Sequence, residues 1–209
     1  MRKGNKHFEY RGNVEMVNNI AKLFWLLIVL LIISACTNKP QNYWVLKAEP
    51  SSISHAAEKG NSAILILLSN LGNKRTDHNS DSLLKEVTAR HERAPIMISS
   101  IANEHGVAMG ITSGRLRNPD NAPPDWALRY IQLCQTDNWK DETIVFDLKE
   151  KVGLLKPVAA QKTCLSCHGP VESFPPELKA KIIRMFPNDK ATGYKNGELI
   201  GFIWAEVIK

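Results

Sequence analysis

Residues 164–168 read Cys-Leu-Ser-Cys-His, and no other segment restricts the fold of this chain as strongly. Two thiols three positions apart, followed at once by an imidazole, form the attachment signature of c-type haem. Each thiol adds across one vinyl group of the porphyrin to form a thioether, and the adjoining imidazole binds the iron. We therefore expect a domain that folds around one covalent haem c, bound by Cys164 and Cys167, with His168 as the proximal ligand.

A Cys-x-x-Cys pair can also be half of a zinc site or a redox-active dithiol. A structural zinc site needs a second pair of ligands, and the sequence holds no other Cys-x-x-Cys. A thioredoxin-type dithiol lies in a βαβ context, whereas this pair follows a loop that contains proline. The histidine directly after the second thiol and the export signal described next favour haem.

The first 35 residues are predicted to be a signal peptide of the lipoprotein type. Basic residues come first, and an unbroken apolar run then extends from residue 23 to residue 33. This run is shorter than the roughly 20 residues that cross a bilayer, and it has the length of a signal-peptide core. The following Ile33-Ser34-Ala35-Cys36 resembles the bacterial lipobox, in which the cysteine is lipidated and becomes the first residue of the mature protein.

Cys36 is therefore the predicted lipidation site, and a start at Met16 would leave a signal of ordinary length. An uncleaved membrane anchor that ends near Ser34 is the alternative. Either arrangement puts the following residues on the periplasmic side of a bacterial membrane, where haem is attached to such motifs. Thr37 is not the aspartate that retains lipoproteins in the inner membrane, which favours the outer membrane.

The formal net charge of +6 overstates the basic character of the mature protein. Five Lys or Arg and two Asp or Glu lie in the predicted signal, which leaves a net charge of about +3. Two haem propionates would reduce it further, to about +1. The sequence also lacks a basic stripe interleaved with aromatic residues, so we expect no nucleic-acid partner.

Residues 36–49 are predicted to be a linker and residues 50–209 a single domain, which is long enough to bury one core. Periodicity and turn residues predict helices at 50–71, 81–104, 126–134 and 175–185, and strands at 107–111, 143–148, 151–160 and 199–208. A hairpin turn is expected at 194–198. Two helices followed by a small sheet that helices interrupt is an α+β arrangement.

Four stretches of the sequence occur together in a recognisable order: the loop Arg117-Asn118-Pro119-Asp120-Asn121-Ala122-Pro123, Trp126 after it, the motif at 164–169, and residues 186–194 with Gly197 and Gly201. In this combination the chain resembles the bacterial c-type haem domains with a PAS-like fold. That family was long catalogued as a domain of unknown function and was first described structurally in a cyanobacterial protein.

The resemblance implies a PAS-like antiparallel sheet with N-terminal helices and haem between them, and it implies His168 as the proximal ligand. Many members carry a Cys in the second helix, shortly before an Ala-Pro pair, and that Cys can bind the iron. Here Ala94-Pro95 is present, but Arg90 occupies the position of the cysteine and His91 follows it.

His91 is our first candidate for the distal ligand, because it lies on the apolar face of the helix predicted at 81–104 and imidazole binds both oxidation states of iron. Pro95 should bend this helix near His91, because its missing N–H leaves that carbonyl without a partner. An iron without a distal ligand is an alternative. The remaining candidates are Met97, Met109 and Cys134, and, with less support, His55, His78 and His105.

Arg115 and Arg117 flank the start of the proline-rich loop and are candidates to bind the haem propionates, since a guanidinium group matches a carboxylate with two parallel hydrogen bonds. Solvated surface charge is the alternative for both. Asn118 and Asn121 are expected to hold the loop through hydrogen bonds to its backbone.

We expect a membrane-tethered monohaem electron carrier that works with an unidentified redox partner protein. An enzyme is not expected, because no acid–base pair near a distal face is recognisable in the sequence. The alternative function is a haem-based redox or gas sensor, since PAS-like folds are used in sensing. Such a sensor would act through a separate partner, because no signalling output module is recognisable here.

Overall fold

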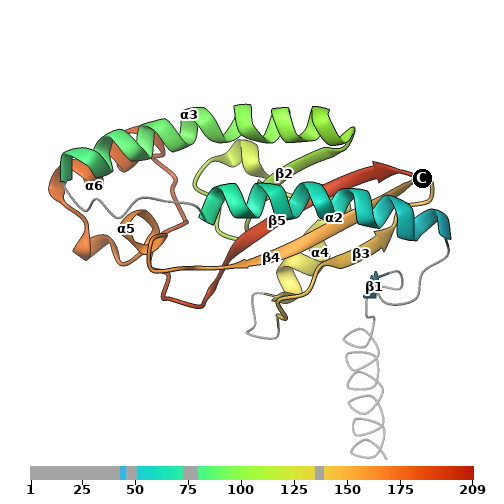
Figure 1. Ribbon diagram of the computed structural model, residues 1–209. Helices are drawn as coiled ribbons and strands as arrows, with labels where there is room; N and C mark the ends of the chain where they lie inside the picture. The colour runs from blue at the N-terminus through green and yellow to red at the C-terminus, as the bar shows by residue number, and fades with distance from the viewer. Residues whose placement is uncertain (1–42, 46–50, 73–79, 135–138) are drawn as a thin grey trace, which may run out of the picture. The chain divides into compact units, whose positions relative to one another are not determined.

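An antiparallel sheet and two long helices dominate the computed structural model, which describes residues 43–45, 51–72, 80–134 and 139–209 (Figure 1). Within these ranges the elements follow the chain in this order: β1 (Tyr43–Val45), α2 (Ser51–Gly72), α3 (Ser80–His105), β2 (Ala108–Thr112), the 3₁₀ turn η1 (Pro119–Asn121), α4 (Asp125–Cys134), β3 (Ile144–Asp147), β4 (Lys151–Ala159), α5 (Leu165–His168), the 3₁₀ turn η2 (Val171–Ser173), α6 (Pro176–Met185) and β5 (Leu199–Ile208). The predicted α+β class is confirmed.

Neighbouring strands of the sheet all pair antiparallel, in the order β1-β3-β4-β5-β2. The longest ladder joins β4 to β5, from Lys151 opposite Ile208 to Ala159 opposite Leu199, with an irregularity between Val158 and Ala159. Because β5 pairs with β4 on one side and with β2 on the other, the last strand of the chain lies inside the sheet. This central position ties the end of the chain to β2, which follows the two long helices.

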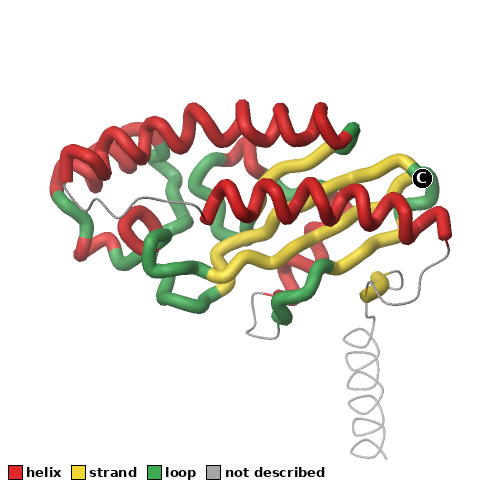
Figure 2. Tube along the Cα trace, viewed as in Figure 1, coloured by secondary structure: helices red, strands yellow, loops and turns green. Residues whose placement is uncertain are grey.

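The sheet is packed on both of its faces, and α2 crosses one of them (Figure 2). Ile203 and Ala205 of β5 belong to the core that α2 covers, whereas Phe202 and Trp204 pack with α4 in a second core. This alternation follows from the pleat, which points successive side chains to opposite faces. Burial on both sides explains why β5 reads as an almost continuous apolar segment.

β4 and β5 are adjacent in the sheet, but the chain between them makes a long excursion over residues 160–198 that holds α5, η2 and α6. Two backbone hydrogen bonds close its base: Ala160 N–H donates to Glu198 O at 2.7 Å, and Gly197 N–H donates to Ala160 O at 2.8 Å. Gly197 has a φ of 87°, which an L side chain adopts only under strain. The predicted turn at 194–198 is thus present. It is not a hairpin turn, because the preceding strand in the chain is β4, which ends at Ala159 before the excursion begins.

The predicted helices and strands are confirmed to within a few residues of their ends. β1 is an addition: it lies inside the predicted linker at 36–49 and pairs with β3. α3 continues past Pro95 as one helix, and the bend expected there stays a prediction. Residues 1–42, with the predicted signal peptide and Cys36, lie outside the described ranges. No described helix combines the length and apolar character that crossing a membrane requires.

Candidate haem site

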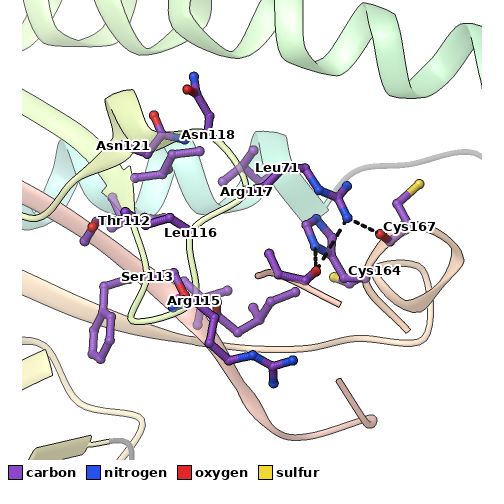
Figure 3. A pocket seen from close by; sticks show the side chains of 18 of the residues that line it. Leu71, Thr112, Ser113, Arg115, Leu116, Arg117, Asn118, Asn121, Cys164 and Cys167 are labelled. Carbon is purple, nitrogen blue, oxygen red and sulfur yellow. Dashed lines mark hydrogen bonds between the residues drawn. The ribbon is translucent and has the colours of Figure 1, made fainter. Parts of the chain in front are cut away.

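A cavity of about 280 Å³ lies where the Cys-x-x-Cys-His motif meets the sheet (Figure 3). Cys164, Cys167 and His168 all line it, so the two thiols and the imidazole share one space. The end of α2, the end of β2 with the loop after it, and the facing ends of β4 and β5 form the other walls. The larger apolar side chains of the lining are Leu71, Ile111, Leu116, Val158, Ile200, Phe202 and Ile203, and polar side chains such as Ser113, Asn118 and Thr163 complete it.

The motif itself forms α5, a helix of a single turn. Cys164 already has helical backbone angles, and His168 N–H donates to Cys164 O at 2.9 Å. Side chains three and four positions apart lie on the same side of a helical turn, which brings Cys164 close to both Cys167 and His168 along the cavity lining. Neither Cys164 nor Cys167 forms a disulfide.

Gly169 ends this turn, and its small size is required there. Its N–H donates to Leu165 O at 2.9 Å, and a Cβ at this position would lie 2.5 Å from the same oxygen. The contact is with backbone, which has little room to yield. Gly169 O also accepts from Gly193 N–H at 2.8 Å, which ties the motif to the segment before β5.

The imidazole of His168 is oriented by a backbone carbonyl. Its Nδ1 lies 2.7 Å from Ala191 O. A carbonyl oxygen only accepts hydrogen bonds, so Nδ1 carries the proton and donates. In the neutral ring the second nitrogen, Nε2, then keeps its lone pair, which is the tautomer that a histidine needs to bind a metal.

Arg117 is buried beneath the motif, with 7% of its surface exposed. Its Nε donates to Asp189 Oδ2 at 3.0 Å. Its Nη2 donates to Cys167 O at 2.5 Å, and a dashed line joins these two residues in Figure 3. Arg115 lies at the surface: its Nε donates to Lys190 O at 3.0 Å, and its guanidinium group stacks over the ring of Tyr194. Both arginines line the cavity, and their contact with propionates stays a prediction.

A family model matches residues 41–207 of this chain, a range that includes every strand from β1 to nearly the end of β5, under the description Tll0287-like. The chain belongs to the Tll0287-like family. The crystal structure of the cyanobacterial haem protein Tll0287 matches it with a TM-score of 0.50 and 21% sequence identity, over 78% of this chain and 98% of that chain. At this identity the match establishes the shared fold. The search of curated proteins found no match.

The family assignment confirms the resemblance to a cyanobacterial-type haem-binding family. The residues around the cavity also fit a c-type haem, since two thiols and a correctly protonated imidazole face an apolar space.

The candidate distal ligands of this Tll0287-like site lie in several different elements. His91 lies in α3, but its side chain falls outside the described residues, as does His78. His91 as distal ligand therefore stays a prediction. None of the other candidates that the structure describes lines the cavity: Met97, Met109, Cys134, His55 and His105.

Cys134 lies in the core between α4 and the sheet. Burial raises the pKa of its thiol, and the hydrogen bond with Tyr130 offsets this only in part. A thiol with a raised pKa stays protonated and is a poor metal ligand. Among the described residues no group of three or more His, Cys, Asp or Glu side chains is placed to hold a metal ion.

Sequence reasoning did not recognise Asp189 and Ala191 as parts of this site. Both lie in the stretch at 186–194, which was singled out only because it resembles the family. Asp189 carries no motif of its own, and a backbone carbonyl such as that of Ala191 leaves no signal in the residue type.

Proposed function

We propose that this chain is an exported monohaem c-type protein that carries electrons, tethered to the periplasmic face of a membrane by lipid on Cys36. The observation that supports the proposal most directly is the convergence of Cys164, Cys167 and His168 on one apolar cavity. A bound haem c would supply an iron that changes its oxidation state by one electron.

The residues of the chain have distinct tasks in this proposal. The thiols of Cys164 and Cys167 would hold the group through thioethers, each formed by addition of S–H across a vinyl C=C bond, which needs no further oxidant. His168 would bind the iron through Nε2 while Ala191 O holds its Nδ1 proton. The apolar walls would exclude water, which limits the rearrangement that accompanies a change of charge. Covalent attachment would also prevent loss of the cofactor outside the cytoplasm.

Intact-protein mass spectrometry of the exported chain tests the cofactor. We expect the mass of one haem on the parent protein and on Cys134→Ala, which removes a buried cysteine outside the cavity. Cys164→Ala with Cys167→Ala should carry no covalent haem. A parent protein without an adduct would refute the proposal.

Electron transfer is tested separately on the haem-loaded protein. We expect a reversible one-electron titration and a six-coordinate, low-spin spectrum in both oxidation states. His91→Ala should lose the low-spin signal if His91 is the distal ligand. Ready binding of carbon monoxide by the parent would instead favour gas sensing, and rapid peroxide turnover would favour an enzyme.

A further inference from the structure

A buried ion pair lies directly behind the motif. The guanidinium group of Arg117 and the carboxylate of Asp189 are 3.0 Å apart, and their side chains are 5% and 9% exposed. An ion pair this deeply buried gives little net stability, because removing two charges from water costs about as much as their attraction returns. Its position therefore requires an explanation beyond the stability of the fold.

Both members of the pair bind the backbone around His168. Asp189 Oδ1 accepts from Ala191 N–H at 2.8 Å, so the carboxylate holds the residue whose carbonyl orients the imidazole. Arg117 Nη2 donates to Cys167 O at 2.5 Å and to Ala191 O at 3.5 Å. The pair thus joins the motif at residue 167 to the segment at residue 191.

A further contact ties the segment at residue 191 to the loop that carries Arg117. Lys190 N–H donates to Leu116 O at 3.0 Å, next to both members of the ion pair. Tyr194 N–H donates to His168 O at 3.0 Å from the far end of the same segment. The backbone on both sides of Ala191 is therefore fixed, and the acceptor for His168 Nδ1 has a single position.

We propose that Arg117 and Asp189 are positioning residues that set the orientation and tautomer of His168 through the Ala191 carbonyl. This inference rests on the proposed binding of haem by His168. It assigns the buried pair to the axial ligand, so the guanidinium group of Arg117 serves the imidazole and not a propionate. Lys could not replace Arg117 fully, because one ammonium group lacks the planar fork that reaches Asp189 and Cys167 together.

The test compares Asp189→Asn with the parent protein, both loaded with haem. Asparagine has nearly the shape of aspartate but leaves the charge of Arg117 unbalanced near the iron. We expect changed g values of the ferric haem in electron paramagnetic resonance and a changed iron–imidazole stretching frequency in the ferrous form. The midpoint potential should rise, because an added positive charge favours the ferrous state. Asp189→Glu, which keeps the charge, should restore part of the parent signature.

Asp147→Asn is the matched control. Asp147 forms an ion pair with Lys209 in which Oδ1 and Nζ are 2.6 Å apart, and neither residue lines the cavity. The control variant should leave all three haem signals unchanged. A haem-loaded Asp189→Asn with the parent's g values, stretching frequency and potential would overturn the inference, even if its melting temperature fell. If Asp189→Asn does not fold, Arg117→Lys replaces it. We expect Arg117→Lys to change the g values and the iron–imidazole stretching frequency, and parent values of both would overturn the inference. A parent protein without haem would instead refute the proposed function itself.

Discussion

Gly169 shows how much of the site depends on single atoms. It follows His168, the proposed iron ligand, closes α5, and accepts a hydrogen bond from Gly193. Its φ of −72° is ordinary for any residue, so backbone conformation does not explain the glycine. The approach of Leu165 O does, because a Cβ would lie 2.5 Å from it.

We therefore expect Gly169→Ala to open the single turn of α5 and to displace His168. The free energy of unfolding should fall by about 1–3 kcal/mol in chemical denaturation, and the yield of attached haem should drop. Gly197→Ala is the control, since a Cβ there meets no atom within 4 Å and only its φ of 87° is strained. It should cost about 1–2 kcal/mol without altering the haem spectrum. Equal haem yields in both variants would contradict this account of Gly169.

Among the elements, α2 connects the core to the cavity. Ile64 and Leu67 on its inner face are fully buried against the sheet, and Leu71 near its end lines the cavity. Gly60 allows the close approach, because a Cβ would lie 2.6 Å from a methyl group of Leu154. The outer face of the same helix exposes Leu65 by 50%.

The two faces of α2 give a direct comparison. Leu67→Ala should reduce the free energy of unfolding by about 2–5 kcal/mol, because it leaves a void in a packed core. Leu65→Ala, the same substitution two positions earlier, should change it by no more than about 0.5 kcal/mol. Urea denaturation measures both. Similar losses in the two variants would show that α2 does not pack on the sheet through the Leu67 face.

The boundaries of the elements were predictable because each rests on neighbours in sequence. The period of α2, the proline at the start of α6 and the apolar run of β5 are local signals. β1 was missed, since three residues are too few to establish a period. The turn at 194–198 was read as a hairpin because proximity in sequence does not reveal that β5 pairs with β4 across the long excursion.

For the molecule as a whole, the site lies entirely within the part of the chain that matches the family. The residues that line the cavity run from Leu71 to Ile203, and the family match begins at residue 41. The predicted lipid anchor at Cys36 is outside that range. Anchoring and haem binding should therefore be separable properties of the protein.

Cys36→Ser tests this separation. We expect the parent in the membrane fraction and the variant without lipid, with the same haem spectrum in both because the cavity does not include residue 36. Cys134→Ser, which alters a buried core cysteine, should leave lipid attachment and membrane association intact. A Cys36→Ser protein that keeps its lipid would refute lipidation at this cysteine. An unlipidated parent that stays in the membrane would favour the uncleaved anchor.

The gathering of Cys164, Cys167 and His168 at one cavity was predictable from the sequence alone, because the three residues lie within about one helical turn. Local periodicity likewise determined most helices and strands. Only the tertiary structure decided the sheet order, the cavity and the acceptor for His168. Arg117, Cys167, Asp189 and Ala191 are far apart along the chain or silent in residue type, and they meet only after β5 has paired between β4 and β2. Contacts of that kind depend on long-range pairing, which no local pattern encodes.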